Sequence, residues 1–115
     1  MQTTIETADK LMTVYLSGEL DHHNAPTVRD KIDETAACFR PEKTVLDFGG
    51  VTFMDSSGIG LVMGRYKLLE SMGCTLEIQN LSDHAYKVMR LAGLDKIATL
   101  ARKGKKEEKD RETTE

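Results

Sequence analysis

The residues of this 115-residue sequence best suited to chemistry are Asp55, Ser56 and Ser57, which form a polar corner before a glycine. All three residue types favour a helix N-terminus, and apolar residues then recur at helical spacing, at Ile59, Val62, Tyr66 and Leu69. A helix N-terminus offers free N–H groups and a positive dipole end, which favour an anion such as the phosphate of a phosphoserine. The corner therefore predicts either helix capping alone or a serine that accepts phosphate, and the residue types leave both interpretations open.

Asp21, His22 and His23 suggest a second chemistry, a hydrolase triad with Ser56, because a serine nucleophile needs an imidazole base and an orienting carboxylate. The Gly-X-Ser-X-Gly pattern that presents such a nucleophile is absent from the sequence. A pair of histidines before a helix is more often a solvated turn. We therefore expect no catalytic residues.

The glycines and cysteines argue against a bound cofactor. Gly49-Gly50 and the segment Gly58-Ile59-Gly60 lack the Walker lysine and the dinucleotide-binding spacing, so turn and packing roles are favoured over a nucleotide loop. The two cysteines, Cys38 and Cys74, have no metal-ligand spacing and are expected to stay reduced. The sequence predicts no cofactor and no metal site.

A strand and a helix must position the serine corner. Residues 44–48 form a short apolar run that suits a strand covered on both faces, and Gly49-Gly50 ends it. The helix after the corner is expected to end before Gly73. Within it, Gly60 and Gly64 share one face. Because each costs up to about 1 kcal/mol relative to alanine, they predict close approach of another backbone, with the sheet favoured over a partner.

The other elements alternate between strand and helix patterns. Residues 3–7 and 11–17 predict a hairpin whose second strand is apolar on both faces, and residues 75–79 predict a further strand. Asn24 and Ser82 are expected to cap two helices. Their apolar stripes are Val28, Ile32 and Ala36 in the first, and Ala85, Val88, Met89, Leu91 and Ala92 in the second. Leu94, Ile97 and Leu100 suggest one last short element of unspecified type. This order predicts an α/β fold with a mixed four-stranded sheet packed against several helices.

Length and composition indicate one domain, which we place at residues 1–101, followed by a charged and disordered tail at residues 102–115. The net charge of −3, with both signs interspersed and few aromatic residues, gives no indication of direct nucleic-acid binding. No apolar run reaches membrane-spanning length, and the first ten residues lack a signal-peptide pattern. We expect a cytoplasmic protein without a membrane partner.

Three segments together carry a resemblance to a known family. They are Gly-Glu-Leu-Asp-His-His at residues 18–23, Phe-Met-Asp-Ser-Ser-Gly-Ile-Gly at residues 53–60 and Gly-Arg-Tyr-Lys at residues 64–67. In this order and spacing the sequence resembles the anti-sigma factor antagonists of the STAS domain family over about residues 1–100, and Met-Asp-Ser-Ser-Gly is the most specific element. The nearest pattern is that of members acting on sigma F in sporulation. Close relatives end in another packed helix, where this chain has its charged segment.

The resemblance implies a sheet covered by helices, no enzymatic activity and reversible phosphorylation of Ser56. It implies that the unphosphorylated protein captures an ATP- or ADP-bound anti-sigma factor that is also the serine kinase, which frees the sigma factor, and that a serine phosphatase restores the antagonist. The partner-binding residues would be Asp21, His22, His23, Asp55, Ser56, Ser57, Gly58, Ile59 and Gly60. Two alternatives are a nucleotide- or small-ligand-binding STAS module and the scaffold of a stress-signalling complex.

Overall fold

The chain begins with the predicted hairpin. The computed structural model describes residues 1–104, and in it β1 (Gln2–Ala8) pairs antiparallel with β2 (Leu11–Leu20). Asp9 and Lys10 form the turn with φ values of 52° and 66°. Positive φ at both central residues matches the twist of a two-residue hairpin, so the turn fixes the register of the pair.

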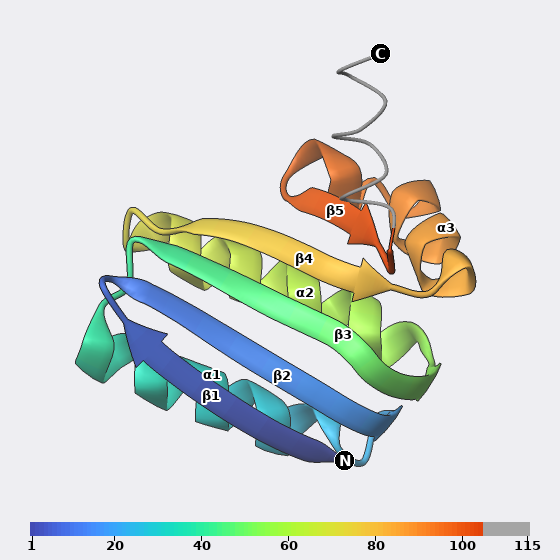
Figure 1. Cartoon of the computed structure of the whole chain (residues 1–115), viewed down its shortest axis with the longest axis horizontal. Helices are drawn as coiled ribbons and strands as arrows, with labels where there is room; N and C mark the ends of the chain where they lie inside the picture. Colours follow the sequence, from blue (N-terminus) through green and yellow to red (C-terminus); the bar gives the residue numbers. More distant parts are fainter. Residues whose placement is uncertain (105–115) are drawn as a thin grey trace.

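Three parallel strands extend the sheet from β2. They are β3 (Lys43–Met54), β4 (Thr75–Leu81) and β5 (Thr99–Arg102), and the strand order is β1-β2-β3-β4-β5. The crossovers contain α1 (Ala25–Phe39), α2 (Ser56–Ser71), and α3 (Asp83–Leu91) with a 3-10 turn at Leu94–Lys96. Because the parallel strands follow one another in a single direction, right-handed crossovers bring their helices to the same face. Figure 1 shows α1 and α2 together behind the sheet.

The sheet has five strands, so the prediction of four was wrong by one. The additional strand is β5, which has only four residues and no alternation of buried and exposed positions. Its strand conformation comes from pairing with β4, where Leu100 lies opposite Ile78, rather than from a local pattern. Arg102 is the last residue of β5, one residue beyond the predicted domain boundary. Lys103 and Gly104 are also described, and the part of the predicted tail from residue 105 onward lies outside the described residues.

One hydrophobic core fills the space between the sheet and the helices. Its large, fully buried members are Met12, Val14, Leu16, Leu20, Val28, Ile32, Leu46, Leu69, Ile78, Leu81, Met89 and Leu94. The opposite face of the sheet has no helix over it within the described chain, and Leu11 and Tyr15 are exposed there. Residues 44–48 are nevertheless all buried, so the expectation that this segment is covered on both faces is confirmed for its residues, although described helices lie over only one face of the sheet. Asp47 is buried on this open face because its carboxylate accepts hydrogen bonds from Gln79 and Asn80 of neighbouring β4, at 2.9 and 2.8 Å.

The predicted helix ends are largely confirmed. Ser82 caps α3 by accepting a hydrogen bond from the N–H of Ala85 at 3.1 Å, and Gly73 and Gly93 follow α2 and α3 with positive φ. Two residues of the predicted apolar stripe of α3 do not face the core: Leu91 is 79% exposed at the end of the helix, and Ala92 is also exposed. None of the helices described within residues 1–104 is long and apolar enough to cross a membrane.

Candidate functional site

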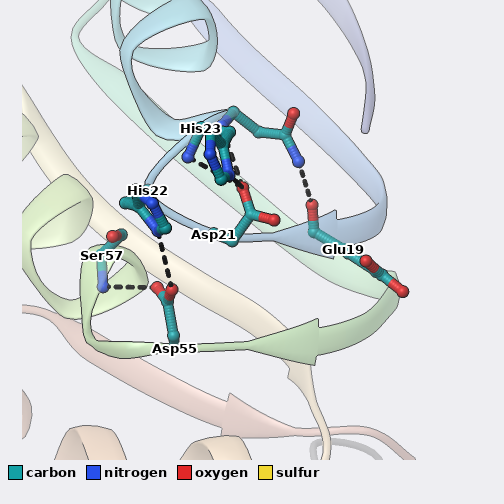
Figure 2. Close-up of polar contacts among 7 residues, drawn as sticks. Glu19, Asp21, His22, His23, Asp55 and Ser57 are labelled. Carbon is teal, nitrogen blue, oxygen red and sulfur yellow. Dashed lines mark hydrogen bonds and ion pairs between the residues drawn. The ribbon is translucent and has the colours of Figure 1, made fainter.

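The carboxyl ends of β2 and β3 bring the two polar motifs together. The strands are parallel, with Leu20 opposite Met54, and the N–H of Asp55 donates to the carbonyl of Leu20 at 3.2 Å. The residues that follow each strand therefore emerge side by side, as parallel strand ends do in α/β proteins. This contact places the turn after β2 next to the start of α2 (Figure 2).

Asp55 is the N-cap of α2. Its backbone is extended, and its Oδ1 accepts a hydrogen bond from the N–H of Ser57 at 2.8 Å. Ser56 and Ser57 are consequently the first two residues of the helix rather than its cap. The side chain of Ser56 is exposed and its hydroxyl makes no hydrogen bond to another described residue. Capping therefore explains Asp55 but does not explain Ser56.

Asp21 organises the turn after β2. Its Oδ1 accepts hydrogen bonds from the N–H groups of His23 and Asn24, at 2.9 and 3.1 Å. Asn24 is the N-cap residue of α1, as predicted, but its side chain makes no capping hydrogen bond, and its amide donates instead to the carbonyl of Glu19 at 2.7 Å. The Asp21 carboxylate satisfies the N–H groups ahead of the helix, and this leaves the Asn24 amide free to tie the turn back to its strand.

Each of the two histidines lies beside a carboxylate. His22 Nδ1 is 3.8 Å from Asp55 Oδ2, and His23 Nδ1 is 3.9 Å from Asp21 Oδ1, with both imidazoles exposed. The two rings are tilted by 37° with centroids 4.0 Å apart. Within the described chain neither imidazole makes a hydrogen bond to the hydroxyl of Ser56. The structure therefore joins the histidines to the corner without arranging them as a base for a serine nucleophile.

The corner keeps a negative charge at neutral pH. The N–H of Ser57 lowers the pKa of Asp55 most strongly, and the Ser57 hydroxyl and His22 lower it further, against a smaller opposing effect of desolvation. A carboxylate that is stabilised in this way stays ionised throughout the physiological range. Any negative group added to Ser56 would lie beside it.

The glycines of α2 have different surroundings from those predicted. A Cβ atom added to Gly60 or Gly64 would meet no atom within 4 Å, so these glycines do not pack against the sheet, and that prediction was wrong. They line an open groove of about 310 Å³ between α1 and α2. Gly58 is the tightly packed glycine, because its Cβ would lie 2.4 Å from Met54 Cγ. Of the predicted partner-binding residues, Gly58 is buried, whereas Ser56 and Gly60 are exposed.

Arg65 is a residue of this region that the sequence analysis did not single out. Its side chain is only 10% exposed, and its Nε lies 2.8 Å from Asp33 Oδ1 on α1, although the N–H is not aligned for a hydrogen bond. Burial lowers the pKa of Arg65 and raises that of Asp33, and each charge opposes the shift of the other. The sequence contained one indication of this buried arginine: Arg65 is four residues from both Leu61 and Leu69, so it shares the buried side of α2 with them.

Comparisons with known proteins agree with this architecture. The family model of the STAS domain matches residues 2–106. An anti-sigma F factor antagonist of Paenibacillus polymyxa is 36% identical over 97 residues, which cover 84% of this chain and 83% of that protein. The structure of the anti-sigma factor antagonist SpoIIAA in its unphosphorylated form matches with a TM-score of 0.72, 29% identity and 96% coverage of both chains. The phosphorylated form of SpoIIAA from Bacillus matches with a TM-score of 0.71 and 32% identity, covering 96% of this chain and 98% of that one. The chain belongs to the STAS domain family.

Proposed function

We propose that this STAS domain is an anti-sigma factor antagonist. In its unphosphorylated form it binds an anti-sigma factor that also acts as a serine kinase, and the sigma factor is released. Phosphorylation of Ser56 by that kinase ends the binding, and a serine phosphatase restores it. The observation that carries the proposal is the exposed hydroxyl of Ser56, the first residue of α2, which bonds to no residue within 1–104 and lies beside a cap supplied by Asp55.

The geometry supports a switch that acts through surface charge. Phosphoserine carries about 1.5 to 2 negative charges at neutral pH. At Ser56 these charges would lie next to the Asp55 carboxylate, whose pKa is already lowered. The positive end of α2 offsets part of the repulsion, so the fold tolerates the phosphate while a docking partner meets added charge and bulk.

The docking surface in this proposal consists of the exposed and half-buried residues at the ends of β2 and β3. They are Asp21, His22, His23, Asp55, Ser56, Ser57, Ile59 and Gly60. Sigma F is the proposed target because the Paenibacillus polymyxa relative is an anti-sigma F factor antagonist. The role is regulatory: the histidines contribute to docking and perform no catalysis, so hydrolysis of simple esters that depends on His22 would contradict it.

Mixing the protein with a purified anti-sigma F factor and ATP, then measuring its intact mass, tests the proposal. We expect the mass of one phosphate to be added to the wild type and to Ser57→Ala, and no addition to Ser56→Ala. We also expect unmodified protein to bind the anti-sigma factor more tightly than phosphorylated protein. Equal binding of the two forms would refute the mechanism, and phosphate on Ser56→Ala but not on Ser57→Ala would move the acceptor by one residue.

A further inference from the structure

The groove between α1 and α2 has a basic lining. It opens beside the serine corner and lies between the first two turns of α1 and the first three turns of α2. Its lining residues are His22, Ala25, Pro26, Arg29, Ser57, Gly60, Leu61, Gly64 and Arg65. Two arginines and a histidine contribute to this surface, and no acidic side chain does. A surface of this composition complements a negatively charged group.

Arg65 presents unused hydrogen-bond donors to this groove. A guanidinium has five N–H donors, and within the described chain none of those of Arg65 makes a hydrogen bond. Among the described residues its ion-pair partner is Asp33, at the Nε atom, and the charges of Arg29 and Asp30 also act on it. Arg29, the other arginine, is paired on the exposed side of α1 with Asp30 at 3.0 Å, a contact worth little in water. A buried guanidinium with free donors has room for a planar, bidentate acceptor such as a carboxylate.

The glycines keep the approach to Arg65 open. Gly60 and Gly64 both line the groove, and neither has an atom within 4 Å of where its Cβ would lie. A glycine in a helix interior lowers helix stability relative to alanine. Helix propensity alone would therefore favour alanine at both positions of the groove. Packing against the described part of the chain does not explain these two glycines.

We infer that the α1–α2 groove receives an acidic side chain of the protein that docks at the serine corner, and that its carboxylate pairs with the guanidinium of Arg65. The groove is continuous with the corner through Ser57 and His22, so one partner can cover both. The identity of that partner rests on the proposed function. The chemistry of the groove does not, and it is tested separately below.

The first experiment uses a peptide of six glutamates as the probe and six glutamines as its matched control, with NMR detection on the full chain. We expect the glutamate peptide to shift the Arg65 Nε–H signal and the backbone amide signals of Gly60 and Gly64, and the glutamine peptide to leave them in place. Gly60→Leu should abolish the shifts, whereas Ala37→Leu, an exposed site roughly 12 Å further along α1 than Arg29, should not. Equal shifts with both peptides, no shifts, or shifts that survive Gly60→Leu would overturn the inference.

The second experiment measures binding to the anti-sigma F factor of Paenibacillus polymyxa. Arg65→Gln should weaken binding by about tenfold or more, and Arg90→Gln, at an exposed position of α3, should leave it unchanged. Gly64→Leu, at a groove residue outside the proposed docking surface, repeats the test without replacing either member of the Arg65–Asp33 pair, in case Arg65→Gln unfolds. If the wild type binds and Gly64→Leu binds equally well, the inference fails while the proposed function stands. If the wild type does not bind, the proposed function fails for this partner. The peptide experiment then tests by itself whether the groove binds a carboxylate.

Discussion

Asp55 and Ser56 divide two tasks at the start of α2. Asp55 holds the helix end through the N–H of Ser57, and Ser56 presents a hydroxyl to solvent. Residue types alone could not separate these tasks, because aspartate and serine are both good caps. The backbone decides between them, since an extended conformation at Asp55 makes it the cap and places Ser56 inside the helix.

Ser56→Ala should fold normally and remain permanently able to dock. Because Ser56 is exposed and makes no hydrogen bond to any residue that the structure describes, we expect the free energy of unfolding to change by less than about 0.5 kcal/mol. Ser56→Asp adds one charge and less bulk than a phosphate, so it should weaken partner binding only in part. Thermal denaturation and titration against the anti-sigma factor check both expectations. A large loss of stability in Ser56→Ala would show that the serine itself supports the helix.

Asp55→Asn should make the free energy of unfolding less dependent on pH in the acidic range than it is in the wild type. The pKa of Asp55 is lowered in the folded state, so its ionised form adds stability above the unfolded-state pKa near 3.8, and this is lost as pH falls through the lower folded-state pKa. We therefore expect the melting temperatures of wild type and Asp55→Asn to differ most at neutral pH and to converge below about pH 4. A difference that is constant across this range would contradict the assignment of the cap.

At the scale of elements, two glycines of α2 should respond in opposite ways to alanine. Gly58→Ala places a Cβ within 2.4 Å of Met54 Cγ in the core and should destabilise the fold by about 1 to 3 kcal/mol. Gly60→Ala meets no atom and should stabilise the helix by up to about 1 kcal/mol. Chemical denaturation of the two variants provides the measurement. If Gly60→Ala is the more harmful change, this account of the groove is wrong.

Most element boundaries followed from local chemistry that the sequence displays. Pro41 limits α1, and Ser82 and Gly93 bracket α3, because their effects depend on the residue itself and its immediate neighbours. The strand β5 and the open surroundings of Gly60 were not predicted, because both depend on residues that are distant in the sequence. Helical spacing shows which residues share a face with Gly60, but it cannot show what lies opposite that face. The position of Arg65 among leucines was visible, whereas its aspartate partner on another helix was not.

At the scale of the whole molecule, the C-terminal boundary of the fold is itself testable. Arg102 lies 5.1 Å from the ring centre of Tyr86 and 3.6 Å from Asp83, and the N–H of Lys103 donates to the carbonyl of Leu81. Removing residues 102–115 therefore takes away contacts with α3 and β4, which the predicted disordered tail would not make. We expect it to lower the melting temperature by several degrees relative to removal of residues 105–115 alone. Equal melting temperatures would show that these contacts contribute nothing.

The cap at Asp55 also has a consequence for the lifetime of the protein in a cell. If the phosphate acceptor were also the helix cap, every cycle of phosphorylation would change the fraction of unfolded chain that proteases can attack. In the proposed switch the cap is Asp55 and the acceptor is Ser56, so phosphorylation leaves the capping hydrogen bond in place and should change the rate of degradation little. The amount of the protein and its phosphorylated fraction would then vary almost independently, and the proposed regulatory signal would be a ratio that protein turnover distorts little.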